Sequence, residues 1–459
     1  MSPAPTLMQH HLPPLRIVFF GLGAVGSNLL IALAELAERD GVAVDFVVFT
    51  IDPAGAREAL YHAERFFDRI EFVGQADFAP LFAAADPIQE ARLADATLLV
   101  NAALPAFNGP IIETGLRVGA HTLDLASDMY NAETERTLVF PQYRYDQALR
   151  DQGLAALINQ GISPGVTDFL IGRSLYDLLA SDRHELEIES VDLYLLEDIE
   201  ADAVVFSWSP VVALEELAQR PRLITDGRLR VLEPFSAPRY HSFPNEPRPT
   251  RQYPLYQEEL LSLHRAFPDI PDLAVYTGGA EVELVKALYQ LNLLSRQTLP
   301  DRPDLTVDAV VRAILPGMQR PRRIEEMLRS GVIRRAHFCA AAEIRFAETV
   351  RNDRQTVIET LGLSYLRYRG LLGSPYAGAT YIAYPTGVGA AIIAWHALQQ
   401  VLQPSASVRA GSSSGELAGV LTSVDLARLL PQSRADAINR DLVAWDIDLF
   451  RSVRDASEA

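Results

Sequence analysis

A cluster of three glycines near the amino terminus constrains the fold of this chain more than any other feature. The segment from Ile17 to Ala34 begins with Val, Ile and Phe, passes through GLGAVG, and continues with Leu and Ala up to Glu35. Its length and apolar character resemble a membrane span, but the change of composition halfway predicts a buried strand, a tight turn and a helix instead. We therefore expect no membrane span in this segment.

The glycines have the spacing of a dinucleotide-binding turn. Gly21, Gly23 and Gly26 form a Gly-x-Gly-x-x-Gly pattern, with Ala24 and Val25 between them. The first glycine permits a sharp turn, the second lets the backbone approach a pyrophosphate, and the third lets the helix pack close to the sheet. The N–H groups and the dipole of the helix then hold the phosphates. These five residues are the predicted pyrophosphate site.

Asp52 is the predicted ribose ligand. It ends the next strand-like run, DFVVFTID, and follows the first glycine by 52 minus 21, or 31, residues. A carboxylate at this place accepts both ribose hydroxyls of NAD and repels the 2′-phosphate of NADP. Arg57 lies close enough in sequence to accommodate NADP, so we predict NAD with NADP possible. The alternative is that Asp52 only caps the helix that begins at Pro53.

Strand-like and helix-compatible runs then alternate. Strands are predicted at residues 16–20, 45–52, 70–73, 97–102, 121–125 and 154–158, with helical stretches between most of them. This alternation predicts the α/β class, a Rossmann doubly wound parallel sheet with right-handed crossovers. Such a sheet binds its ligand beyond the carboxyl ends of the strands.

The residues just after the later strands are therefore candidates for the nicotinamide end of the site. Asn101 and Ala102 follow the fourth strand, and the Asn101 amide either bonds the cofactor or satisfies its own turn. Asp124 ends the fifth strand and is the predicted catalytic residue, because it could relay a proton to a substrate nitrogen. The alternative is that Asp124 caps the next helical turn. Ser163 and Gly165 form a turn expected against the nicotinamide ribose, or a turn that only initiates a helix.

Several segments along the chain resemble the saccharopine dehydrogenase-like family, which includes saccharopine reductases and carboxynorspermidine dehydrogenases. The resemblance rests on GLGAVG, VNAALPAFNGPIIETGLRVGAHTLDLASD, GISPGVTDFL, FSWSPVVALEEL, TRQYPLYQEELLSLHRAFPDI, YIAYPTGVGAAIIAWHAL and GELAGVLTSVDL, in this order. The Ser-Pro-Gly-Val-Thr turn at residues 163–167 is the most specific of them. One departure concerns the substrate: Gln257 stands where the carboxynorspermidine enzymes commonly have histidine.

The resemblance implies a domain plan and an activity. Residues 1–170 would form the Rossmann domain, residues 171–375 a second α+β domain for substrate binding and dimerisation, and residues 376–459 helices that return to the first domain. The activity would be that of an NAD(P)-dependent oxidoreductase that acts on C–N bonds and transfers hydride between nicotinamide and an imine or secondary amine. The alternatives are an NAD-dependent polyamine synthase of the homospermidine type and a dinucleotide-binding regulatory protein without turnover.

Substrate contacts are predicted in the second domain. Arg239, Arg251 and Tyr253 lie in the segment APRYHSFPNEPRPTRQYPLY, and a bidentate guanidinium suits the carboxylate of an amino acid. Trp208 could cover the nicotinamide or the substrate. The alternative is that the arginines belong to an exposed loop and that Trp208 is a core residue.

Charge and cysteine content limit the partners. The chain has 41 Lys plus Arg and 59 Asp plus Glu, a formal net charge of −18. This balance argues against nucleic acid and anionic membranes as partners and permits a cationic substrate. Cys339 is the only cysteine, which fits a reducing compartment and excludes a metal site built on cysteines. We expect a cytoplasmic homodimer that binds a small amine or amino acid and no metal.

Overall fold

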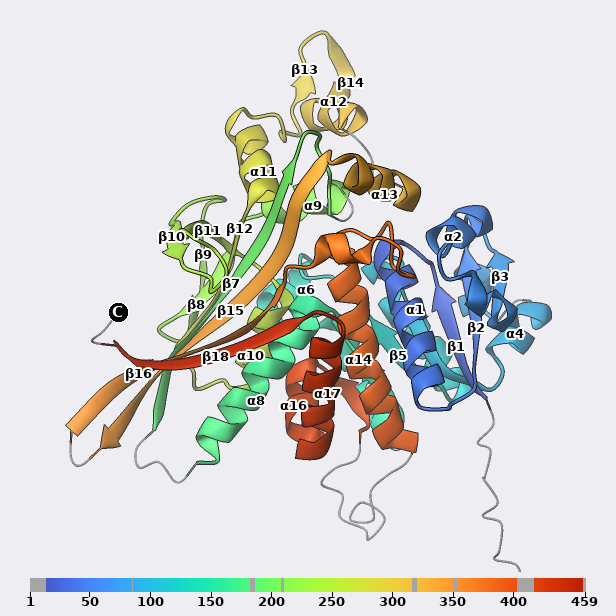
Figure 1. Cartoon of the computed structure of the whole chain (residues 1–459), viewed down its shortest axis with the longest axis horizontal. Helices are drawn as coiled ribbons and strands as arrows, with labels where there is room; N and C mark the ends of the chain where they lie inside the picture. Colours follow the sequence, from blue (N-terminus) through green and yellow to red (C-terminus); the bar gives the residue numbers. More distant parts are fainter. Residues whose placement is uncertain are drawn as a thin grey trace, which may run out of the picture.

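The computed structural model describes residues 14–84, 86–181, 186–207, 210–315, 320–350, 353–402 and 417–456. Two sheets organise these residues, one on each side of a helical layer that includes α8 (Thr167–Leu179), α10 (Glu258–Ala266), α14 (Ala383–Leu402), α16 (Ser423–Leu429) and α17 (Gln432–Ala444) (Figure 1). None of the described helices is both long enough and apolar enough to cross a membrane.

The first sheet is parallel and has the strand order β17-β6-β5-β4-β1-β2-β3. Its strands are β1 (Leu15–Phe20), β2 (Val44–Thr50), β3 (Ile70–Gly74), β4 (Ala96–Asn101), β5 (His121–Asp124), β6 (Ala155–Leu157) and β17 (Gly419–Leu421). The predicted Rossmann sheet is confirmed. The sequence did not indicate β17, a three-residue strand that the carboxyl-terminal part of the chain adds beside β6.

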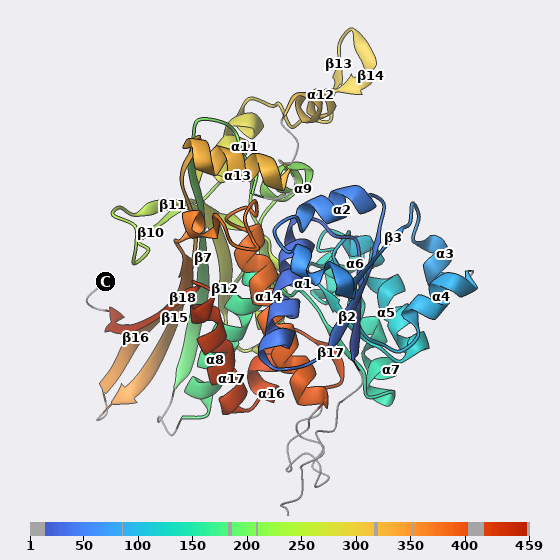
Figure 2. The same cartoon turned by 45° about the vertical axis from the view of Figure 1, so that its right-hand side comes forward.

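Helices cover both faces of this sheet. Ile17 and Phe19 of β1 pack in one apolar cluster with α1 (Ala24–Arg39) and α14, whereas Val18 and Phe20 pack in another with residues of α5 (Asn108–Val118) and its neighbours. Figure 2 shows α14 lying along α1. Gly387 permits this approach, because a Cβ there would lie 2.7 Å from the backbone N of Leu29. The sheet is therefore buried on both faces, as its uninterrupted apolar strands predict.

The second sheet is mixed and has the main strand order β10-β11-β12-β7-β15-β16-β18. These strands are β10 (Arg239–His241), β11 (Thr250–Leu255), β12 (Asp272–Gly278), β7 (Glu187–Ala201), β15 (Ile333–Val350), β16 (Asp353–Tyr365) and β18 (Asp448–Asp455). A hairpin turn at Asp226 and Gly227 joins β8 (Arg222–Thr225) to β9 (Arg228–Val231), with φ of 50° and 67°. Such a turn requires positive φ at both positions.

The carboxyl-terminal part of the chain divides between the two sheets. Helix α14 packs against α1 on the first sheet, and strand β17 pairs with β6 of that sheet. Strand β18 pairs with β16 of the second sheet. The expected segment 376–459 thus contains an element of the second sheet as well as the returning helices.

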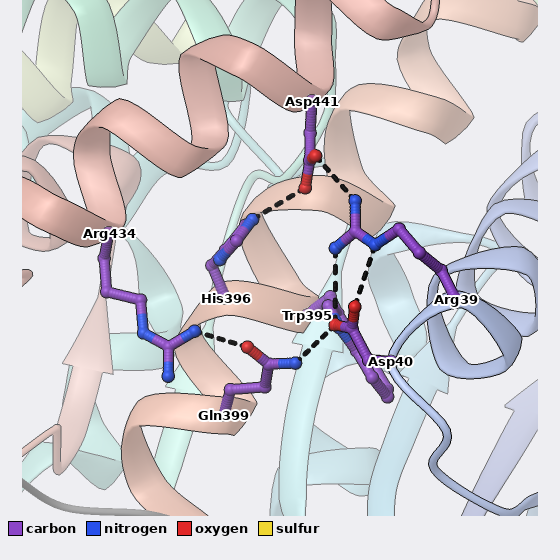
Figure 3. Close-up of polar contacts among 7 residues, drawn as sticks. All are labelled: Arg39, Asp40, Trp395, His396, Gln399, Arg434 and Asp441. Atoms are coloured by element: carbon purple, nitrogen blue, oxygen red, sulfur yellow. Dashed lines mark hydrogen bonds and ion pairs between the residues drawn. The ribbon is translucent and has the colours of Figure 1, made fainter.

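A polar network fastens the returning helices to α1 (Figure 3). Arg39, at the end of α1, donates to Asp40 at 2.8 Å and to Asp441 of α17 at 2.6 Å. Asp441 also lies 2.8 Å from Nε2 of the buried His396 on α14. Asp40 accepts from the indole of Trp395 at 2.8 Å. Charged partners that are this close and partly buried hold three helix segments in register.

Candidate functional site

The glycine turn leaves the start of α1 open. Gly23 is the N-cap residue, no side chain caps the helix, and the first turn has no acidic residue. A Cβ on Gly23 would meet nothing within 4 Å, whereas a Cβ on Gly26 would lie 2.8 Å from the Cβ of Ala102. Gly21 has a φ of +82°. Gly21 and Gly26 therefore show the turn and the close packing predicted for them, and the uncapped N–H groups that begin at Ala24 and Val25 suit a pyrophosphate.

A cavity of about 510 Å³ lies beside this turn. Two large apolar side chains on its wall are strongly exposed, Ile51 at 78% and Leu104 at 58%. Phe78 and Phe107 complete this apolar part of the wall. Exposed apolar surface that lines a concave site indicates a site for the apolar part of a ligand.

Asp52 borders this cavity and also a second one, of about 370 Å³, which shares Leu22, Gly23 and Gly55 with it. Its carboxylate accepts from the N–H of Gly55 at 2.9 Å and so caps α2 (Pro53–Ala59). The capping alternative is therefore observed, and the place of Asp52 on the cavity wall remains compatible with the ribose role. Arg57 stacks on Phe72 at 4.3 Å and borders neither cavity.

Asn101 uses its amide within its own loop. Its Nδ2 donates to the carbonyl of Leu104 at 2.9 Å and to Asn108 at 2.6 Å, and its Oδ1 accepts from the N–H of Ala103 at 3.0 Å. These contacts correspond to the turn alternative. Ala102 contributes its small side chain, since it is the residue against which Gly26 packs.

Asp124 lies at the end of β5 and is buried. Its Oδ1 accepts from the backbone N–H of Asn159 at 2.8 Å and its Oδ2 from Gln142 at 3.0 Å, so it does not cap the following turn. Burial raises the pKa of Asp124 to about 7, although the bonds from Asn159 and Gln142 oppose this shift. Asp124 is thus divided between its protonated and ionised forms near neutral pH.

The turn at residues 163–167 packs on a carboxylate that we did not predict. Ser163 donates its hydroxyl to Glu259, and Thr167 donates to the same oxygen at 3.0 Å. Gly165 has a φ of +124°, a region that disfavours any residue with a side chain. The hydroxyl of Ser163 therefore positions the turn.

Glu258 and Glu259 open α10 and are both buried, at 6% and 0% exposure. Glu258 accepts from the backbone N–H of Ser127 at 3.1 Å, and burial raises the pKa of Glu258 to about 7. The Ser127 hydroxyl accepts from Gln142, which also bonds Asp124, so Glu258 and Asp124 belong to one network. In the sequence, this pair is indicated by two adjacent acidic residues directly before two leucines, in YQEELL.

Three of the predicted substrate residues, Arg239, Arg251 and Tyr253, bond to other residues of the second domain. Arg239 pairs with Asp192 at 2.8 Å and stacks on Tyr276 at 4.7 Å, on the face of the second sheet opposite α8 and α10. Arg251 donates to the hydroxyl of Tyr240 at 2.9 Å. The structure thus places Arg239 on the face away from Asp124 and Glu258.

The other two predicted substrate residues are Tyr253 and Trp208. Tyr253 donates to Glu283 at 3.0 Å. Trp208 lies outside the described residues. The guanidinium of Arg222, which we did not predict, lies 4.6 Å from the ring centre of Tyr256. Among the residues that the structure describes, no group of three His, Cys, Asp or Glu side chains could hold a metal ion.

Comparison with solved structures decides the fold family. The chain matches apo saccharopine dehydrogenase (L-Glu forming) from Saccharomyces cerevisiae with a TM-score of 0.60, over 96% of this chain and 100% of that one, at 14% sequence identity. The chain has a saccharopine dehydrogenase-like fold. The resemblance predicted from the seven sequence segments is confirmed.

A curated relative supports the same assignment of this saccharopine dehydrogenase-like chain. It is the carboxyaminopropylagmatine dehydrogenase of a Synechocystis species, 29% identical over 197 residues, which are 41% of this chain and 46% of the relative. The match thus spans less than half of the relative's length. No family model matches the chain.

Proposed function

We propose that this chain is an NAD-dependent oxidoreductase that transfers hydride between nicotinamide and an imine or secondary amine. The observation that carries the proposal is the pair Asp124 and Glu258, two buried carboxyl groups with pKa values raised to about 7, at the strand-end edge that also contains the dinucleotide-type glycine turn. Reduction of an imine needs a proton at nitrogen, which such groups hold at neutral pH. The likeness to a dehydrogenase of a carboxylated amine supports the same reaction class.

The cofactor would occupy the 510 Å³ cavity and the glycine turn. The backbone from Gly23 to Gly26 would hold the pyrophosphate, and the apolar wall with Ile51 and Leu104 would hold the adenine. NAD, when bound, supplies or accepts the hydride. The carboxylate of Asp52 on the cavity wall favours NAD, because a 2′-phosphate would meet its negative charge, whereas Arg57 is engaged with Phe72. NADP remains the second candidate.

The two carboxyl groups would divide the acid–base work. Both oxygens of Asp124 accept hydrogen bonds from Asn159 and Gln142, so Asp124 is oriented and held by the protein. Glu258 accepts one bond from Ser127 and shares the network through Gln142. Glu258 is therefore the proposed proton donor at the substrate nitrogen. Asp124, which the sequence analysis named as catalytic, is proposed to relay the proton or to set the charge of the site.

We further propose a homodimer that acts in the cytoplasm on a small amine or amino acid. The homodimer, with the second domain at its interface, is what the family resemblance implies. The single, buried Cys339 fits a reducing compartment. The excess of acidic residues argues against nucleic acid and anionic membranes as partners.

Titration with NADH and NADPH, followed by a screen of amines with aldehydes and keto acids for loss of NADH absorbance, tests the proposal. We expect NADH to bind more tightly, and Glu258→Gln to lower kcat by about 10²-fold or more with NADH affinity unchanged. Glu133→Gln, on the exposed helix α6 (Ala132–Thr137), is the matched control. If neither dinucleotide binds at submillimolar concentration, the proposal is wrong.

A further inference from the structure

The 370 Å³ cavity beside the glycine turn has walls from distant parts of the chain. Gly23 and Ala24, at the start of α1, contribute to its wall, and so do Arg320, Pro321 and the segment 375–380 before α14. Ala24 borders this cavity but not the 510 Å³ cavity. A pyrophosphate at the first N–H groups of α1 would therefore lie at the 370 Å³ cavity, while the adenosine of the same cofactor occupies the larger one.

Arg320 is the only cation among the described residues that line either cavity. Its side chain is 79% exposed, and its Nη1 donates to Oε2 of Glu58 on α2 at 3.1 Å. A guanidinium has five N–H donors in a planar fork, so it can hold Glu58 and a phosphate together. Asp52 and Glu58 line the same cavity, and a pyrophosphate that enters beside two carboxylates needs a compensating positive charge.

Helix α13 (Pro321–Ser330), which begins directly after this arginine, is fastened to the segment that follows α2 (Figure 1). The buried carboxylate of Glu325 accepts from the hydroxyl of Tyr61, lies 3.0 Å from Nε2 of His62, and accepts from Arg329 of its own helix at 2.5 Å. Burial would raise the pKa of Glu325, but these three partners outweigh it and lower that pKa to about 2. Glu325 is therefore ionised at neutral pH and holds α13 beside the cavity.

We propose that Arg320 binds the pyrophosphate of the dinucleotide cofactor, and that Glu325 is a positioning residue that holds Arg320 at the cavity. The inference rests on the proposed function, because it adds a contact to the proposed cofactor site. Helix α13 leads into β15 of the second sheet, so the contact would come from outside the Rossmann sheet. A guanidinium pairs with phosphate through two parallel N–H bonds, which gives both affinity and orientation. Cofactor affinity would then depend on the docking of α13 beside α2.

Fluorescence titrations of the full chain with NADH and NADPH test the phosphate contact. We expect Arg320→Gln to weaken the binding of both dinucleotides by about tenfold or more and to a similar degree, since a charge-assisted bond to their common pyrophosphate is lost. Arg323→Gln is the matched control, because it removes an exposed cation from the same helix, where Arg323 pairs with Glu326. This control should leave both affinities unchanged.

Glu325→Gln tests the positioning role, with Glu326→Gln on the exposed side of the same helix as its control. Glu325→Gln should weaken NADH binding by about threefold or more in the wild-type background, because α13 is then held less firmly. In the Arg320→Gln background it should have no further effect, whereas a merely structural role would weaken binding equally in both backgrounds. Glu326→Gln should change neither affinity.

Three results would overturn the inference. Arg320→Gln could bind NADH as tightly as Arg323→Gln does, or it could weaken only NADPH binding, which would place Arg320 at the 2′-phosphate instead. An equal effect of Glu325→Gln in the two backgrounds, or no effect in either, would reject the positioning role. If the wild-type chain binds neither dinucleotide, the proposed function fails together with the inference. If it binds NADH and Arg320→Gln binds equally well, the inference alone fails.

Discussion

Valine at two of the three turn glycines should separate cofactor binding from helix packing. A Cβ at position 26 would lie 2.8 Å from the Cβ of Ala102. Carbon atoms pack at about 3.5–4.0 Å, so Gly26→Val forces α1 and the end of β4 apart by about 1 Å. Overpacking of this kind costs about 1–3 kcal/mol, and valine recovers only a few tenths of this in helix propensity over glycine. We expect Gly26→Val to lose about 2 kcal/mol of stability.

Gly23→Val adds the same atoms where the structure is open. No atom lies within 4 Å of its Cβ, and its φ of −89° and ψ of −163° are accessible to valine. Stability should therefore change by less than about 1 kcal/mol. The new side chain would occupy the place proposed for the pyrophosphate, so NADH affinity should fall by about tenfold or more, or about 1.4 kcal/mol.

Urea unfolding followed by circular dichroism and NADH fluorescence titration measure the two effects. Gly23→Val should change only the titration, whereas Gly26→Val should lower the urea midpoint. The reasoning is refuted if Gly23→Val binds NADH as the wild type does, or if Gly26→Val unfolds at the wild-type urea concentration.

Three other substitutions test single residues. Asp52→Ala should raise the affinity for NADPH relative to NADH by about tenfold and cost about 1 kcal/mol through the lost cap, measured by paired titrations and urea unfolding; an unchanged cofactor ratio removes this residue from the ribose site. The pKa of Asp124 is raised from 3.8 to about 7, so its contribution to stability is fully present below pH 3.8 and is lost as the pH rises through 7. Asp124→Asn should therefore flatten the fall of the urea midpoint between pH 4 and pH 7, and an identical slope would contradict the shift. Asp441→Asn removes the carboxylate that pairs with Arg39 and bonds His396, and should cost about 1.5–3 kcal/mol. Asp436→Asn on the same helix removes a carboxylate that bonds the side chain of Gln432 and should cost little; equal midpoints for the two variants would mean that the network of Figure 3 contributes nothing.

The parts of the fold that the sequence predicts are those written in short stretches of chain. The apolar run before Gly21 and the glycine spacing predict β1, the turn and α1, since a buried parallel strand and a phosphate-binding turn each need their own local composition. The Asp-Gly pair at residues 226 and 227 is likewise a local signal for a turn. β17 could not be predicted from the sequence, because a strand of three residues has too short a pattern and forms through its pairing with β6.

The candidate site divides in the same way. Asp124 could be predicted because it is the last residue of a strand, and a parallel sheet binds its ligands at the carboxyl ends of its strands. Glu258 comes 134 residues later and reaches the same network only through the packing of α10, which also brings Glu259 to the turn at residues 163–167. The sequence analysis predicted a substrate contact at Arg239 because the surrounding segment is rich in arginine and tyrosine. The structure instead pairs Arg239 with Asp192, on the face of the second sheet opposite α8 and α10.

By itself, the sequence determined the dinucleotide-type turn, six strands of the parallel sheet and the family resemblance, because each is carried by runs of neighbouring residues. Only the tertiary structure decided which carboxyl groups are buried away from water. Burial raises the pKa values of Asp124 and Glu258 to about 7 and leaves one oxygen of Glu281 without a partner. Desolvation depends on what packs around a group from distant parts of the chain, and the acidic excess visible in the sequence therefore acquires chemical meaning only after folding.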